Sequence, residues 1–345
     1  MGNVRLIKVT VLLKSFIYPV ILVSGVYIFD VVLGFNAKAQ AQVLSAYPQK
    51  PLRLVVPFAP GGTADLLGRF VAQMLSSRYR QSVVVDNKGG AGGALGSDIV
   101  AKSNPDGYSI ILSNAASHAS VVAINKKLPY DALYDFSHAA LICVIPQTFV
   151  VNKDFPATQL DEFIAYAKRE PGKLSYGTAG MGSMGHFSGE LLKVLAGIHL
   201  THVAYKGTAP ASIDLIANRV QVMFQNGPES QNAVRNGLIR LLAVTGEKRS
   251  LLFPDTPTFV ESGFKQFVSY TWYGLSFPRA TPEPIVQLLN QSVNQALAEP
   301  ASLKRLSELG VEPRAMSVGQ YTQFVATEIA KFRDIAQRAN ILAPD

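Results

Sequence analysis

The chain repeats one local pattern: a short β-branched run, a glycine-rich break, and then a segment with the apolar period of a helix. Early in the chain, "LRLVVPF" leads through "APGG" into "TADLLGRFVAQMLSSRY", and "SVVVDN" leads through "KGGAGG" into "ALGSDIVAKS". Later, "KLSYGTA" leads through "GMGSMG" into "HFSGELLKVLAG", and "THVAY" leads through "KGTAP" into "ASIDLIANR". Strands that alternate with helices of this length form βαβ units around mainly parallel sheets. The pattern predicts an α/β fold.

Length and composition agree with a folded protein of more than one core. A chain of 345 residues is too long for one ordinary core, so we expect two domains, or one domain interrupted by another. Apolar residues make up 48% of the chain and charged residues 16%, which argues against disorder.

The first forty residues differ from the rest and resemble an export signal. Arg5, Lys8 and Lys14 precede an apolar stretch over residues 15–35, and small residues follow in "NAKAQAQ". This layout predicts a secretory signal peptide over residues 1–41, and hence a periplasmic protein. An uncleaved membrane anchor is the alternative, because the apolar stretch approaches spanning length. Asp30 within the stretch counts against that alternative.

The charged residues and the one cysteine exclude some classes of function. The formal net charge is +8, but Lys and Arg are scattered and never run longer than two, so nucleic-acid binding is disfavoured. The positive charge instead favours attraction of anions. Cys143 is the one cysteine of the chain, and its apolar setting "LICVIP" predicts a buried thiol.

The glycine loops are candidate anion sites. The first N–H groups of a helix lack partners within the helix and lie at the positive end of its dipole. Glycine lets the backbone approach a ligand closely, and ligands of open α/β sheets bind beyond the carboxyl ends of the strands. The alternative is that each glycine only makes a tight turn. Several such loops in one chain favour the anion site.

The loops do not fit a phosphate-bearing cofactor. "GMGSMG", residues 180–185, satisfies G-x-G-x-x-G after a strand, which formally suggests a dinucleotide. That motif also requires an acidic residue at the end of the next strand, where this chain has Tyr205 and Lys206. No loop carries a Walker A lysine either. We therefore expect no cofactor and predict a small carboxylate as the ligand.

Five stretches, taken in order, carry a family resemblance. They are "YPQKPLRLVVPFAPGGTADLLGR", "VVVDNKGGAGGALGSDIVAKSNPDGYSIIL", "LSYGTAGMGSMGHF", "VAYKGTAPA" and "WYGLSFPRATPEPIV". Together they resemble the Bug family of extracytoplasmic solute-binding proteins, which serve tripartite tricarboxylate transporters. The resemblance implies a type II periplasmic-binding-protein fold, in which two α/β lobes close a cleft over a small organic anion. It implies no catalysis, inner-membrane transporter subunits as partners, and a monomer.

The resemblance also implies a domain map. Residues 47–146 and 272–345 would form lobe 1, residues 147–271 would form lobe 2, and the two crossovers would be the hinge. In the C-terminal part, Thr281 is the expected N-cap of a helix whose first residue is Pro282.

Matched residue by residue, the family's ligand site falls on both lobes. Lobe 1 would contribute Phe58, Ala59, Pro60, Gly61, Gly62, Asp65, Ser113 and Asn114. Lobe 2 would contribute Thr178, Ala179, Gly180, Gly182, Ser183, His186, Tyr205, Lys206, Gly207 and Gln225. We expect Asp65 to order its loop rather than touch an anion, because like charges repel. Ser113 and Asn114 could instead only cap a helix, His186 could be a structural hydrogen-bonder, and Lys206 a solvated rim charge.

One departure from the family pattern bears on the ligand. Where many members carry an acidic residue after the strand "VQVMF", this chain has Gln225, which offers a donor and an acceptor but no charge. We therefore predict a ligand without a cationic group, such as an aromatic or aliphatic mono- or dicarboxylate. Phe58, Trp272 and Tyr273 are candidates for an aromatic wall of the cleft, with core packing as the alternative for Trp272.

Two other functions compete with transport. Ser183 and His186 are three residues apart, which suggests a Ser-His hydrolase, but the G-x-S-x-G motif is absent because position 181 is Met. His199 and His202 would point to opposite faces of a strand, a poor geometry for a shared metal. A ligand sensor or adaptor for a signalling partner is the remaining alternative.

Overall fold

The computed structural model of the chain describes residues 47–341, so the predicted signal peptide lies outside the described residues. The strands are β1 (Leu52–Val56), β2 (Val83–Asn87), β3 (Ser109–Asn114), β4 (Phe136–Asn152), β5 (Ser175–Thr178), β6 (Thr201–Ala204), β7 (Val222–Asn226), β8 (Ile239–Val244), β9 (Tyr270–Pro278) and β10 (Glu312–Pro313). The helices are α2 (Thr63–Tyr79), α3 (Ala94–Ala101), α4 (Val121–Ile124), α5 (Leu160–Arg169), α6 (Met184–Ala196), α7 (Thr208–Ile216), α8 (Gly227–Arg235), α9 (Glu283–Leu297), α10 (Pro300–Glu308) and α11 (Val318–Arg338). Two short helical turns, η1 (Ala91–Gly93) and η2 (Ala116–Ser120), complete the described elements.

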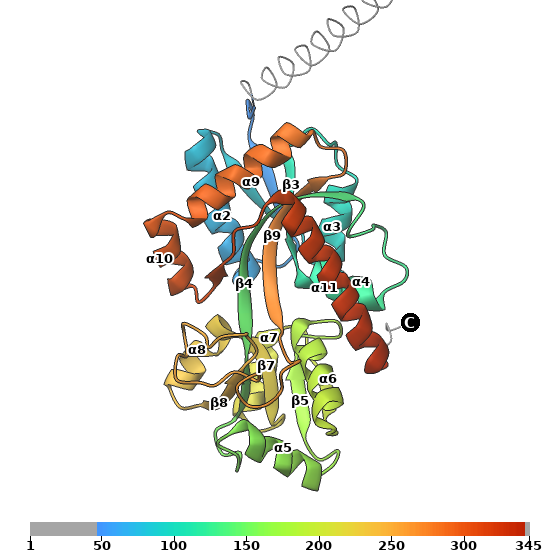
Figure 1. Cartoon of the computed structure of the whole chain (residues 1–345), viewed down its shortest axis with the longest axis vertical. Helices are drawn as coiled ribbons and strands as arrows, with labels where there is room; N and C mark the ends of the chain where they lie inside the picture. Colours follow the sequence, from blue (N-terminus) through green and yellow to red (C-terminus); the bar gives the residue numbers. More distant parts are fainter. Residues whose placement is uncertain (1–46, 342–345) are drawn as a thin grey trace, which may run out of the picture. The chain divides into compact units, whose positions relative to one another are not determined.

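Strand β4 takes part in two groups of strands. Its residues 136–146 pair antiparallel with β9, whereas residues 147–152 pair antiparallel with β7 and β8. On one side, β1 pairs in parallel with β2 and β3, and β3 pairs with β9. On the other, β5 pairs in parallel with β6 and β7. We call the group with β1, β2, β3, β9 and β10 the first lobe and the group with β5, β6, β7 and β8 the second lobe (Figure 1).

The parallel pairs are those that the glycine loops predict, and the antiparallel strands have a separate cause. β4 carries the chain from the first lobe to the second, and β9 brings it back in the opposite direction, so the two must pair antiparallel. Figure 1 shows them side by side through the middle of this part of the chain.

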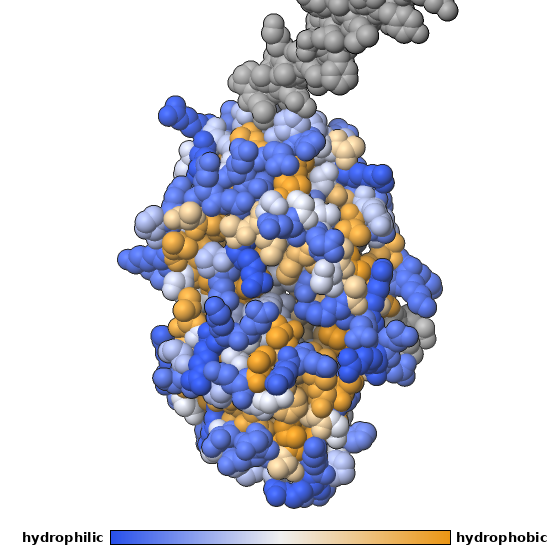
Figure 2. Space-filling model, viewed as in Figure 1, coloured by the Kyte–Doolittle hydropathy of each residue, from blue (hydrophilic) through white to orange (hydrophobic). Residues whose placement is uncertain are grey.

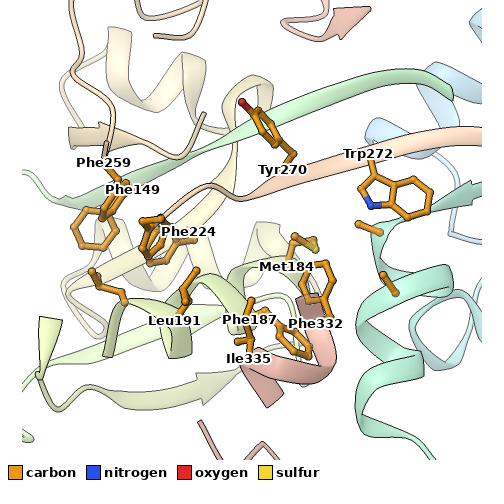
Figure 3. Close-up of a cluster of buried hydrophobic side chains, with 14 of the residues drawn as sticks. Phe149, Met184, Phe187, Leu191, Phe224, Phe259, Tyr270, Trp272, Phe332 and Ile335 are labelled. Carbon is orange, nitrogen blue, oxygen red and sulfur yellow. The ribbon is translucent and has the colours of Figure 1, made fainter. Parts of the chain in front are cut away.

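Helix α11 packs against both lobes. It follows the first-lobe helices in sequence, yet the rings of Phe332 in α11 and Phe187 in α6 lie edge to face with centroids 4.8 Å apart. Figure 3 shows these two side chains next to Ile335 of α11. The buried core is therefore continuous from the first lobe, through α11, to the aromatic cluster around Phe149 and Phe224 in the second.

The aromatic residues of β9 divide between two faces. Trp272 is completely buried and its Nε1 donates to Glu328 Oε2 of α11 at 3.1 Å, so it belongs to the core and not to a cleft wall. Helix α9 begins at Glu283 with Pro282 as its N-cap, so the predicted N-cap at Thr281 and first residue at Pro282 were each one residue early. The Thr281 hydroxyl instead donates to the Pro278 carbonyl at 2.8 Å. The Cys143 thiol is buried, as predicted.

The surface carries polar and apolar side chains interspersed over the face that Figure 2 shows. Within residues 47–341, none of the helices has the length and apolar character that crossing a membrane requires.

Gly189 tests how tightly α6 packs on its sheet. A Cβ at this position would lie 2.3 Å from Cε2 of Tyr176, a buried ring whose hydroxyl donates to Glu190. Gly189→Ala should therefore lower the free energy of unfolding by about 1–3 kcal/mol in urea denaturation. Gly319→Ala in α11 is the control, because its Cβ would meet no atom within 4 Å and alanine favours the helix. Equal losses in the two variants would contradict this account.

Candidate functional site

A cavity of about 670 Å³ lies between the two lobes. The first lobe lines it with the loop after β1, the loop after β3 and part of β9. The second lobe lines it with the residues that follow β5, β6 and β7. Apart from β9, these segments follow the carboxyl ends of strands, where ligands of α/β proteins bind.

Four helices begin at this cavity, and they differ in how their first N–H groups are satisfied. α6 is capped by Ser183, whose Oγ accepts from the His186 backbone N–H at 3.3 Å, and α8 has a capping box of Asn226 and Glu229. α2 and α7 instead follow Gly62 and Gly207, which have no side chain to cap them. Because free N–H groups at a helix start attract anions, α2 and α7 offer an anion site with one half on each lobe.

Asp65 orders the loop before α2, as expected. Its Oδ2 accepts from the Gly61 N–H at 3.1 Å and from Arg69 Nε at 3.0 Å, and its Oδ1 accepts from Asn87 Nδ2 at 3.1 Å. Gly61 has φ of 91°, a backbone conformation that glycine adopts without strain. Burial disfavours the charged form of the carboxyl, but the donated hydrogen bonds outweigh this and lower the pKa of Asp65 from its ordinary value of 3.8.

Part of the cavity wall is apolar. Phe58 and Tyr273 of the first lobe and Met181, Met184 and Phe224 of the second line it. Tyr273 faces the cavity while its neighbour Trp272 faces the core, because successive strand residues point to opposite faces. A ligand body without charge fits this wall.

Gln225 leaves one donor free at the cavity. The residue is 3% exposed, and its Oε1 accepts from the Ser212 hydroxyl at 3.0 Å. Its Nε2 has no hydrogen-bond partner within residues 47–341. A buried amide donor without a partner is costly, so a ligand acceptor at this place would satisfy it.

Lys206 and Glu229 are the charged side chains among the described residues that line the cavity. Thr63 Oγ1 donates to Glu229 Oε1 at 3.3 Å across the lobes. A second link between the lobes runs from Ser120 Oγ to the Gly182 carbonyl at 2.6 Å. Glu229 is exposed, but the surrounding protein excludes part of the water from its carboxyl group. This loss of solvation disfavours the charged form and raises the pKa of Glu229.

The predicted site residues divide into two sets. Those that line the cavity are Phe58, Ala59, Pro60, Gly62, Asn114, Ala179, Gly182, Ser183, Lys206, Gly207 and Gln225. Those outside the lining are Gly61, Asp65, Ser113, Thr178, Gly180, His186 and Tyr205. Sequence reasoning missed Met181, Met184 and Glu229. Of these, Glu229 had a signal, since "NGPE" has the spacing of a capping box.

Several residues of the second set make structural contacts instead. Ser113 Oγ lies 3.0 Å from Ser276 Oγ and 2.8 Å from the Tyr321 hydroxyl in the core. Thr178 Oγ1 lies 2.7 Å from His202 Nε2, and the Tyr205 hydroxyl donates to Asp214 at 2.8 Å. These side chains hold the loops that form the cavity.

Ser183 and His186 do not form a nucleophile and base. His186 Nδ1 accepts from the Gly182 N–H at 3.2 Å, and the Ser183 hydroxyl caps the helix through the backbone of His186. Burial disfavours the charged ring and lowers the pKa of His186. The pair therefore shapes the start of α6. Residues 47–341 contain no group of three or more His, Cys, Asp or Glu side chains placed to hold a metal ion.

Removal of the Asp65 side chain should loosen the loop before α2. Asp65→Ala deletes the acceptor of three hydrogen bonds, so we expect the free energy of unfolding to fall by about 1–3 kcal/mol at pH 7 and the Gly61 amide to exchange faster with deuterium. The wild-type advantage should be present above pH 3.8 and be lost as the pH falls through the lowered pKa. Arg69→Ala, which removes only the exposed partner, should cost less than about 1 kcal/mol. A similar loss in both variants would argue against this role of Asp65.

Comparisons with known proteins place the chain in a family. Residues 67–341 match the model of the tripartite tricarboxylate transporter family receptor. The chain is 32% identical over 317 residues to Protein BugT of Bordetella pertussis. This match covers 92% of this chain and 96% of the relative.

Two solved structures from Rhodopseudomonas palustris share the fold. A protein whose structure contains adipate is 37% identical, with a TM-score of 0.80, and the match covers 86% of this chain and 99% of that one. A protein with bound malate is 33% identical, with a TM-score of 0.75, and the match covers 84% of this chain and 99% of that one.

The predicted fold of two α/β lobes is confirmed, as is the resemblance to Bug proteins. The chain belongs to the receptor family of the tripartite tricarboxylate transporters. Members of this family are solute-binding proteins and not enzymes.

Proposed function

We propose that this receptor binds a small organic carboxylate in the cavity between its lobes, with the first main-chain N–H groups of α2 and α7. One observation carries the proposal: two helices from opposite lobes begin at the same cavity after glycines that cannot cap them. The adipate and malate held by the related proteins support a carboxylate as the ligand class.

The ligand proposed here has an uncharged body and no cationic group. The apolar wall around Phe58, Met184 and Tyr273 supports the first property. The free amide donor of Gln225 supports the second, because an ammonium group offers it no acceptor.

The lobes would close about residues 146–147 and 271–272, and the receptor would deliver its ligand to inner-membrane transporter subunits from the periplasm. The change of pairing partner along β4, from β9 at Pro146 to β7 at Gln147, supports this hinge. Membership of an extracytoplasmic receptor family supports the location.

A panel of ligands tests the function. Thermal-shift screening followed by calorimetry should find stabilisation by small mono- or dicarboxylates, and none by nucleotides at the same concentration. Mass spectrometry of small molecules released from freshly purified protein should identify an organic acid. Binding of a nucleotide, with no organic acid bound, would contradict the proposal.

Proline at the first position of α7 tests the role of the main chain. Thr208→Pro removes one N–H group from α7 at a position that tolerates proline, so the fold should survive. Carboxylate affinity should fall about tenfold or more, because a charge-assisted hydrogen bond is lost. Thr208→Ala keeps the N–H group and is the matched control. Equal affinities of the two variants would show that this donor does not contact the ligand.

Gln225→Glu tests the prediction about cationic groups. Glutarate and glutamate differ by one ammonium group, so their affinity ratio isolates its effect. The wild type should prefer glutarate, and a carboxylate at position 225 should shift the ratio toward glutamate at least tenfold. A wild-type preference for glutamate would contradict the prediction.

A further inference from the structure

Glu229 is an acidic side chain at the proposed binding site for an anion. It lines the cavity together with Lys206, and no other charged side chain among the described lining residues offsets it. Since like charges repel, its presence there calls for a reason beyond attraction of the ligand.

The helix cap does not explain the charge. Glu229 is the third residue of α8, where it accepts from the Asn226 backbone N–H at 3.3 Å in the capping box. Glutamine serves equally well at this position of a capping box, because its side-chain oxygen accepts the same bond. The cap requires only an acceptor, and the helix dipole favours a negative charge in this first turn only modestly.

The carboxylate of Glu229 lies beside both halves of the proposed anion site. Its Oε1 accepts from Thr63 Oγ1, at the first residue of α2, at 3.3 Å. It also interacts with the hydroxyl of Thr208, at the first residue of α7. These are the two helices whose N–H groups would hold the ligand. A carboxylate bound there would therefore lie within a few ångströms of Glu229, on the order of 5 Å, where charges interact strongly in a cleft.

We infer that Glu229 is a specificity-determining residue that limits the negative charge of the ligand, so that the receptor prefers a monocarboxylate with an uncharged body to a dicarboxylate of the same length. The inference rests on the proposed function. Lys206 and Glu229 offset each other, so a ligand with one carboxylate adds one negative charge to the cavity and a dicarboxylate adds two. The apolar residues of the lining offer the second carboxylate no positive charge.

Hexanoate and adipate test the inference, because they have the same carbon chain and differ by one carboxylate. Wild-type protein should bind hexanoate more tightly in calorimetry at low ionic strength. Glu229→Gln keeps the cap and removes the charge, so it should tighten adipate binding by about tenfold or more and hexanoate binding by about threefold or less. Added salt should narrow the discrimination of the wild type and leave that of the variant nearly unchanged, which a purely structural role would not produce.

Glu283→Gln is the matched control. Glu283 is also an exposed acid in the first turn of a helix, α9, and it lies outside the cavity lining, so the variant changes the net charge equally. Its ratio of hexanoate to adipate affinity should match the wild type, and an equal melting temperature of Glu229→Gln would show that the cap persists.

Three results would count against the inference. An unchanged ratio in Glu229→Gln, or a wild-type preference for adipate, overturns it and leaves the proposed function standing. If no organic acid binds either protein, the proposed function fails and this inference fails with it.

Discussion

The positions at which parallel strands end determine where this receptor can bind an anion. In each lobe, parallel strands finish at the same edge of the sheet and lead into the start of a helix, in most cases through a glycine loop. Because β4 takes part in both groups of strands and β9 returns beside it, the two edges border one cavity. Helix starts from both lobes thus gather at one place without any run of basic side chains.

The way each helix start is satisfied separates structural from available N–H groups. α6 and α8 use their own side chains as caps, whereas α2 and α7 begin after glycines. The loop before α2 stays ordered because the Asp65 carboxylate, in the first turn of the helix, accepts a hydrogen bond from the Gly61 N–H. This arrangement positions the loop firmly and still leaves donors for a ligand.

The fold and the loops that form the cavity could be predicted from the sequence, since the strand, glycine and helix pattern is local. Which side chains face the cavity could not, because that depends on how a strand is oriented. In β3, Asn114 lines the cavity while Ser113 points into the core, and in β9, Tyr273 and Trp272 divide in the same way. From the sequence, all four residues were candidates for the cavity. No local pattern marks Met181 or Met184 as cavity residues. The capping-box pattern that contains Glu229 predicts a helix start and not a place in the cavity.

The packing of α11 has a consequence for how the chain folds. Phe187 belongs to a helix made midway through synthesis, and the ring that covers it, Phe332, lies close to the C-terminus. The second lobe therefore keeps an apolar surface uncovered until almost the whole chain is available. Docking of the last helix completes both lobes at once, and a chain shortened before Phe332 would leave two unfinished cores instead of one.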